Sequence, residues 1–226
     1  MEQEFLVSKI ISKETKQTLL KRKDNPATIR FFLLAILYLA INILVVIAWN
    51  QSIEYLLISQ IIYAILTCSI FAALHETAHG TAFKTKKLNR ISSLISGFFH
   101  FYPPSLFKEL HFTHHRFTHV PGKDPEISFG NKPLPPILLN IGTYLSWISG
   151  LPVLFYKFFM LLVGTIGMPE IIRKNIFPFV NKNKKKDVFI ECLIFVVGYF
   201  LIIYLLLINN QNIMFLTKHI VLKLIN

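Results

Sequence analysis

Apolar residues in this chain gather in long blocks instead of alternating with polar ones. Residues 31–49 contain no charged side chain, residues 53–74 contain only Glu54 at their edge, and residues 188–208 contain only Glu191 near their start. A helix needs about 20 apolar residues to cross the hydrocarbon core of a bilayer. The three blocks therefore predict three membrane spans in an all-α integral membrane protein, in agreement with a hydrophobic content of 53%.

The first two blocks predict a helical hairpin over residues 31–74, because only the uncharged turn 50–52 separates them. No break in the pattern separates Leu74 from the residues that follow it. We therefore expect the second helix to continue past the membrane surface and to carry His75 and His79.

Residues 137–166 are apolar, but both of their flanks are basic, so the segment should enter and leave the membrane on the same side. At a rise of about 1.5 Å per residue, a segment of this length is too short for two full crossings. Gly150-Leu151-Pro152 interrupts it near the middle. We expect an interfacial or re-entrant helical pair, with a single span as the alternative. The half-apolar residues 209–226 suggest the beginning of a return span.

The formal net charge of +12 indicates orientation and does not indicate a nucleic-acid partner. Lys and Arg number seven in residues 1–30, eight in residues 84–132 and six in residues 166–187, whereas the turn at 50–52 has none. Basic residues accumulate on the cytoplasmic side of membrane proteins. The N-terminal segment 1–30 and the histidine-rich segment 75–132 are therefore predicted to be cytoplasmic, at the inner membrane if the source is bacterial.

Six of the eight histidines form two groups at the spacing of metal ligands. On a helix, residues four apart lie on one face, and the four histidines of the second group would share an arc of about 140°. Pro121-Gly122 is expected to end that helix. Imidazole binds iron, zinc, copper and nickel, so the groups predict a metal site. The first group is His75 and His79, and the second is His111, His114, His115 and His119.

The stretch HETAHG, residues 75–80, also fits H-E-x-x-H, the helical zinc site of metalloproteases. In that alternative, His75 and His79 bind zinc and Glu76 is the general base. A third ligand is then required downstream, and most of the second histidine group is left unexplained. An intramembrane protease would normally take an aspartate ligand from an Asp-Gly dipeptide, which this sequence lacks.

HETAHG followed by HFTHHRFTHVPGKDPE resembles the first and second histidine boxes of the membrane fatty acid desaturase family, which includes related hydroxylases and carotenoid ketolases. Members place two spans before the first box. Many bacterial members follow the second box with a Thr and an Asp-Pro-Glu, as Thr118 and Asp124-Pro125-Glu126 do here. The resemblance covers roughly residues 20–210.

The resemblance implies two non-haem iron ions, O2 as co-substrate, and the introduction of a double bond into a lipid acyl chain drawn from the bilayer. Electrons would come from an external donor of the ferredoxin or cytochrome type. The residues that it implies as ligands are His75, His79, His111, His114, His115 and His119, the last at a position where relatives often carry Asn or Gln. Those that it implies as supporting or structural are Glu76, Thr118, Asp124 and Glu126.

The family's third box, H-x2-3-H-H, does not occur after residue 119. We expect residues 1–226 to form a single desaturase-like domain that is incomplete at its C-terminus. A partner chain that carries the third box is a second explanation, and a non-catalytic relative is a third. A lipid or carotenoid hydroxylase or ketolase is the alternative activity, because these enzymes use the same ligands.

Overall fold

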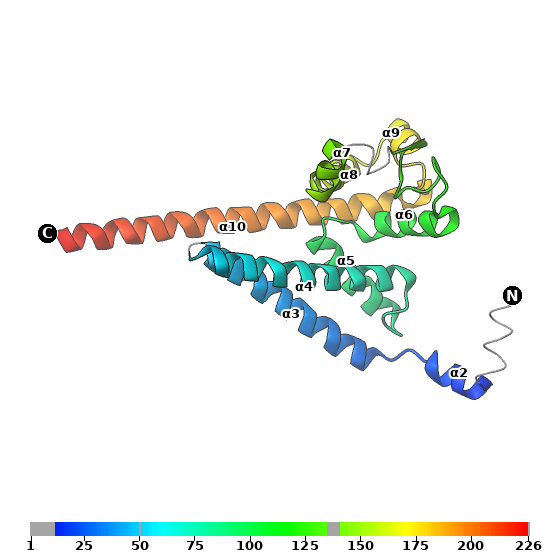
Figure 1. The fold of residues 1–226 in the computed structure, drawn as a ribbon, viewed down its shortest axis with the longest axis horizontal. Coiled ribbons are helices and arrows are strands. Elements are labelled where there is room, and N and C mark those ends of the chain that lie inside the picture. Colours follow the sequence, from blue (N-terminus) through cyan, green and yellow to red (C-terminus); the bar gives the residue numbers. More distant parts are fainter. Residues whose placement is uncertain (1–11, 50, 135–140, 226) are drawn as a thin grey trace. The chain divides into compact units, whose positions relative to one another are not determined.

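The computed structural model describes residues 12–49, 51–134 and 141–225, and the described chain is mostly helical (Figure 1). The predicted all-α class is confirmed at this level. The chain divides into two compact units, residues 1–99 and 100–226, here called unit one and unit two. The prediction of one desaturase-like domain is not tested by this division and stays a prediction.

Unit one is built around two long helices that pack along each other (Figure 1). At their interface the buried Tyr38 donates a hydrogen bond to the Tyr63 hydroxyl, with 3.2 Å between the oxygens. α5 packs against α4. The helices of unit one are α2 (Lys13–Leu19), α3 (Asp24–Trp49), α4 (Ile53–His79) and α5 (Lys86–Phe99).

The segments before α3 and after α4 are joined by hydrogen bonds between residues far apart in the sequence. Arg22 Nη1 donates to the Gly80 carbonyl oxygen at 2.6 Å. The Asp24 carboxylate accepts from the backbone N–H and the hydroxyl of Thr85 at 2.9 and 2.7 Å. These bonds fix the end of the helix pair at which the first histidine group lies.

α4 continues from the apolar block into the first histidine group, as predicted, and ends at His79. Gly80 follows in the left-handed conformation at φ +68°, which glycine adopts without steric cost. The Gly80 and Thr81 N–H groups donate to the Thr77 and Glu76 carbonyl oxygens at 3.0 and 3.1 Å. The end of α4 is therefore well capped.

The described part of unit two combines six helical elements with a two-stranded antiparallel ladder, in which Ser128 pairs with Pro133 and Phe129 with Lys132. α10 packs against both α8 and α6. The elements are α6 (Pro104–Phe117), β1 (Ser128–Phe129), β2 (Lys132–Pro133), α7 (Ile141–Ile148), α8 (Leu151–Thr165), α9 (Glu170–Ile176), the 3-10 helix η1 (Lys182–Lys184) and α10 (Lys185–Ile225).

The interrupted apolar segment forms two helices, α7 and α8, separated at Gly150, whose φ is +70°. Neither helix is long enough for a full crossing, since α7 has 8 residues and α8 has 15. The helical pair and its break thus agree with expectation. Residues 137–140 lie outside the described residues, and the re-entrant or interfacial placement stays a prediction.

α10 is one continuous helix of 41 residues that contains the predicted span 188–208 and extends beyond it. The expectation that the chain turns back after residue 208 is therefore wrong. The polar run Asn209-Asn210-Gln211-Asn212 contains neither Gly nor Pro, the residues that end helices. Polar residues alone did not interrupt the backbone hydrogen bonding of this helix.

Among the residues that the structure describes, three stretches are long and apolar enough to cross a membrane: Lys13–Trp49, Ile53–His79 and Lys182–Leu205. Many of their large apolar side chains are exposed, among them Leu33, Ile61 and Phe200. Water would penalise this exposure, but lipid would not. The three helices indicate a membrane protein, while the side on which each loop lies stays a prediction.

Candidate metal centre

The first histidine group lies on the last two turns of α4 in unit one. The imidazole rings of His75 and His79 are 4.9 Å apart between centroids and inclined by 61°. One ring nitrogen of each lies within 4.8 Å of the other, and both side chains are half-buried. The pair therefore presents two nitrogen ligands on one helix face, as the i, i+4 spacing predicted.

Glu76 uses both carboxylate oxygens in contacts with neighbouring side chains. Oε1 lies 3.0 Å from Nδ1 of His75, and Oε2 accepts a hydrogen bond from the Thr81 hydroxyl at 2.8 Å. With Nδ1 of His75 directed at a carboxylate, Nε2 is the atom placed to bind metal. A protease base would have to activate water with this carboxylate, so its engagement weighs against the H-E-x-x-H alternative.

The second histidine group begins on α6 in unit two, where His111 and His115 lie one turn apart. Their Nε2 atoms are 2.9 Å apart, and the ring centroids are 4.3 Å apart. His111 is buried and stacks on Phe107 with 8° between the ring planes, which fixes its orientation. Two ring nitrogens that converge on one point are suited to bind a common ion.

His114 is oriented by a carboxylate in the same way as His75. Its Nδ1 donates to both oxygens of Asp124, at 3.0 and 3.1 Å, and lies 3.4 Å from Oε2 of Glu126. The His114 ring centroid is 5.8 Å from that of His115 and 6.3 Å from that of His111. Because Nδ1 of His114 faces the Asp124 carboxylate, Nε2 points away from it.

Asp124 is buried and accepts backbone hydrogen bonds as well, from the N–H of His119 at 2.8 Å and of Glu126 at 3.0 Å. Burial by itself would raise the pKa of this carboxyl. The Glu126 N–H, the His114 imidazole and the His119 N–H outweigh burial and lower the pKa below its ordinary value of 3.8. Asp124 is therefore ionised at neutral pH and holds His114 by a charge-assisted hydrogen bond.

The predicted helix through His119 is too long, because α6 ends at Phe117. His119 is exposed and adopts a left-handed conformation at φ +61°, and its N–H is taken by Asp124. The helix thus ends before Pro121, because the contact of the His119 N–H with Asp124, five residues further on, replaces helical hydrogen bonding. His119 does not share the α6 face of His111 and His115, and its role as a ligand stays a prediction.

Thr118 and Glu126 have supporting contacts in this loop. The Thr118 hydroxyl donates to the His114 carbonyl oxygen at 2.8 Å and so satisfies one of the last carbonyl groups of α6. Glu126 is nearly half exposed, and its carboxylate is the more distant of the two near His114. Both positions agree with a structural part in the second group.

Sequence reasoning missed one residue that positions the second group. Glu191 of α10 is fully buried and accepts from the N–H and the hydroxyl of Ser105 at 2.7 and 2.6 Å. Ser105 lies in the first turn of α6, so this carboxylate anchors the helix that carries His111 and His114. The sequence did contain a signal for this residue, namely an acidic side chain within an apolar block. Burying such a side chain in a membrane segment costs free energy unless it has a hydrogen-bonding or charged partner.

The sequence model of the family described as fatty acid desaturase matches residues 52–224, which is more than half of the chain and includes both histidine groups. The chain belongs to the fatty acid desaturase family. Membership of this desaturase family indicates an oxidoreductase of lipid metabolism and confirms the resemblance seen in the two histidine boxes. No curated protein matches the chain, and no solved structure does.

The side chains of both boxes fit a metal centre of the desaturase type. Each box places a histidine pair one helical turn apart with ring nitrogens within 4.8 Å. Each also contains one histidine whose Nδ1 faces a carboxylate, His75 with Glu76 and His114 with Asp124. Metal-bound histidines usually have such a partner on the second ring nitrogen.

Proposed function

We propose that this desaturase-family chain takes part in the O2-dependent introduction of a double bond into a lipid acyl chain. The proposed ligands of its non-haem iron centre are His75 and His79 of the first box and His111, His114 and His115 of the second, with His119 as a sixth candidate. The observation that carries the proposal is the carboxylate on Nδ1 of one histidine in each box.

Two iron ions held by these histidines would supply the activation of O2 and the removal of hydrogen from an unactivated C–H bond. The chain's own residues prepare the nitrogen donors. Glu76 and Asp124 hold the Nδ1 protons of His75 and His114, which fixes the tautomer and leaves Nε2 basic. The stacking of Phe107 on His111 limits rotation of that ring.

The acyl substrate would approach from the bilayer, since the first box follows directly on the apolar length of α4. Two irons require more ligands than these histidines provide. We propose that the rest come from a segment or a partner chain that carries the family's third box. An external donor of the ferredoxin or cytochrome type would supply electrons.

The metal content of the detergent-purified chain tests the ligand assignment. We expect near two irons per chain by elemental analysis once the third box is supplied, and loss of iron in both His75→Ala and His114→Ala. His219→Ala, which changes a histidine outside both boxes, should retain the wild-type content. One zinc, lost only with His75→Ala, would support the protease alternative. No stoichiometric metal under any condition would indicate a non-catalytic relative.

The product distinguishes a desaturase from a hydroxylase or ketolase. The chain would be expressed in a bacterial host together with a ferredoxin-type donor and a segment or chain that supplies the third box, and the host's fatty acids analysed by mass spectrometry. We expect a loss of two mass units from an acyl chain, absent with His111→Ala. A gain of one oxygen would assign hydroxylation, and a gain of oxygen with loss of two hydrogens would assign ketolation.

A further inference from the structure

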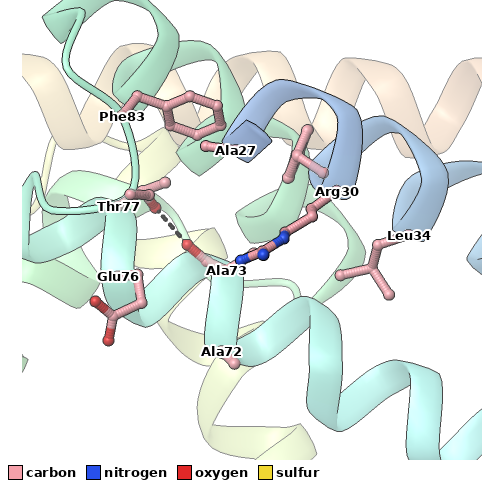
Figure 2. A pocket seen from close by; sticks show the side chains of 10 residues that line it. Ala27, Arg30, Leu34, Ala72, Ala73, Glu76, Thr77 and Phe83 are labelled. Atoms are coloured by element: carbon pink, nitrogen blue, oxygen red, sulfur yellow. Dashed lines mark hydrogen bonds between the residues drawn. The ribbon is translucent and has the colours of Figure 1, made fainter. Parts of the chain in front are cut away.

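A hollow of about 440 Å³ lies between α3 and α4 in unit one, close to the end of α4 (Figure 2). Its volume falls within the range of about 300–1,000 Å³ that is usual for ligand pockets. Apart from one arginine and one glutamate, its lining is mostly apolar and small. The lining residues are Ala27, Arg30, Phe31, Leu34, Ala72, Ala73, Glu76, Thr77, Ala82 and Phe83.

Short side chains create this hollow. Ala27 on α3 and Ala72 and Ala73 on α4 line it, and their methyl groups are too short to fill the space. Further along the same helix pair, Tyr38 and Tyr63 fill the interface with ring centroids 5.6 Å apart. The helix pair is therefore closely packed in its middle and open at one end.

The wall beyond the end of α4 is fixed in position. Phe83 is buried, and its ring meets that of Phe31 edge-on at 6.3 Å between centroids. Its N–H donates to Asn89 Oδ1 at 3.3 Å, and its carbonyl oxygen accepts from Asn89 Nδ2 at 2.8 Å. The hollow is thus bounded by a restrained segment and would not collapse without cost.

Arg30 places a cation beside this apolar space. Figure 2 shows its guanidinium reaching toward Ala73 across the hollow. In the part of the chain that the structure describes, Arg30 has no hydrogen bond or ion pair. The carboxylate of Glu76 points away from it, toward its bonds with His75 and Thr81. The hollow therefore has a cation whose charge is not neutralised locally.

The segments at the mouth of the hollow are strongly basic. The hydrogen bonds of Arg22 and Asp24 to Gly80 and Thr85 bring the segment before α3 and the turn after α4 together. Anionic lipids of the cytoplasmic leaflet attract clusters of basic residues near a membrane helix. Those in these two segments and at the start of α5 are Lys21, Arg22, Lys23, Lys84, Lys86 and Lys87, all exposed.

We propose that this hollow binds an anionic phospholipid, with the phosphodiester on Arg30 and part of one acyl chain between α3 and α4. Basic charge and an apolar space favour a lipid over a free phosphate, which would leave the space unfilled. Arginine can keep its stem along the apolar wall while its charged end reaches the headgroup level.

The proposed site adjoins the first histidine group through Glu76, which lines the hollow and contacts His75, but it lies on another face of α4. At 100° per residue, the lining positions of α4 and the two ligands of the first box are centred about 110° apart around the helix. A lipid in the hollow would therefore lie beside the helix that carries His75 and His79, on another face. It would support the end of α4 and would not be the oxidised substrate.

Native mass spectrometry of the purified chain tests the proposal, with phosphatidylglycerol and phosphatidylcholine of identical acyl chains as the two probes. We expect tighter binding of phosphatidylglycerol. Arg30→Gln should reduce that binding about fivefold, the factor expected for one basic residue near an anionic surface. It should reduce phosphatidylcholine binding less, because the choline cation offsets the charge of the phosphodiester that both lipids carry. Arg30→Lys retains the positive charge and should keep most of the preference for phosphatidylglycerol. Retention in this variant would show that the weaker binding of Arg30→Gln comes from the lost charge and not from misfolding.

Two further variants separate the hollow from surface charge. Lys87→Gln removes one exposed charge at the mouth and should have a smaller effect than Arg30→Gln. Ala73→Leu fills the hollow without changing charge and should weaken both lipids. Equal binding of the two lipids, equal effects of Arg30→Gln and Lys87→Gln, or full competition by soluble glycerol phosphate would overturn the proposal. Iron content is measured separately and does not enter this test.

Discussion

Individual carboxylates orient one histidine in each box of this desaturase-family chain. Asp124 is the clearest case, because it is buried, ionised and bonded through both oxygens to Nδ1 of His114. Glu76 makes the corresponding contact with His75 through one oxygen. The two boxes thus share one structural device, although one carboxylate follows its histidine directly and the other lies ten residues away.

Asp124→Asn should lower iron affinity by about 10- to 100-fold, the usual effect of removing a residue that orients a metal-bound histidine. Asparagine has almost the same shape but lacks the charge that holds Nδ1–H. Titration of the purified chain with Fe(II) measures the change, with circular dichroism to verify helicity. Glu126→Gln alters the more exposed and more distant carboxylate and should have a smaller effect. Equal effects of the two variants would contradict this role for Asp124.

At the scale of elements, the second histidine box depends on how α10 holds α6. Glu191→Leu should lower the free energy of unfolding by about 1–3 kcal/mol, because the part-buried Ser105 N–H and hydroxyl would lose their acceptor. Thermal unfolding in detergent measures the loss. Ser105→Ala removes only the hydroxyl donor and should cost less. If Ser105→Ala lowers the free energy of unfolding little further when added to Glu191→Leu, both residues act through one contact. Fully additive losses would contradict a shared contact.

α9 contains an ion pair that predicts a pH dependence of stability. Arg173 donates to both oxygens of Glu170, at 3.0 and 2.8 Å, and also to the Val180 carbonyl oxygen at 2.7 Å. These side-chain hydrogen bonds lower the pKa of Glu170 from 4.5 to about 2. Since the folded pKa is the lower one, the stabilisation is complete above pH 4.5 and disappears as the pH falls toward 2.

Glu170→Gln should therefore lower the melting temperature at pH 7 and have no effect near pH 2. Melting curves of both proteins at several pH values between these limits measure the difference. Because the Glu170 side chain is partly exposed, the effect should be small and should decrease with added salt. A difference that is constant across the whole range would show that the charge of Glu170 has no part in it.

At the scale of the whole molecule, the distribution of basic residues predicts which loops face the cytoplasm. We expect residue 51 to be outside and residue 182 inside. Single cysteines would be introduced at Gln51 or Lys182 after replacement of Cys68 and Cys192 by alanine. A membrane-impermeant maleimide should then label intact cells only at residue 51. Labelling at residue 182 instead would reverse the orientation, and labelling at both would exclude the three-span arrangement.

The sequence by itself determined the features that depend on neighbouring residues. Apolar blocks of sufficient length gave helices with the length of membrane spans, and the i, i+4 spacing placed His75 with His79 and His111 with His115 on single helix faces. The break at Gly150 could likewise be predicted from the sequence, because glycine adopts the left-handed conformation found there without steric cost.

Only the tertiary structure decided the features that depend on side-chain contacts outside the regular helices or on residues far apart in the chain. The contact of Asp124 with the His119 N–H ends α6 at Phe117, a boundary that local helix signals place too late. Glu191 has its partner 86 residues away, and the hollow beside Arg30 exists only because small residues of two helices line it. Backbone propensity and periodicity are local, whereas burial, long-range hydrogen bonds and empty space arise only when the helices pack.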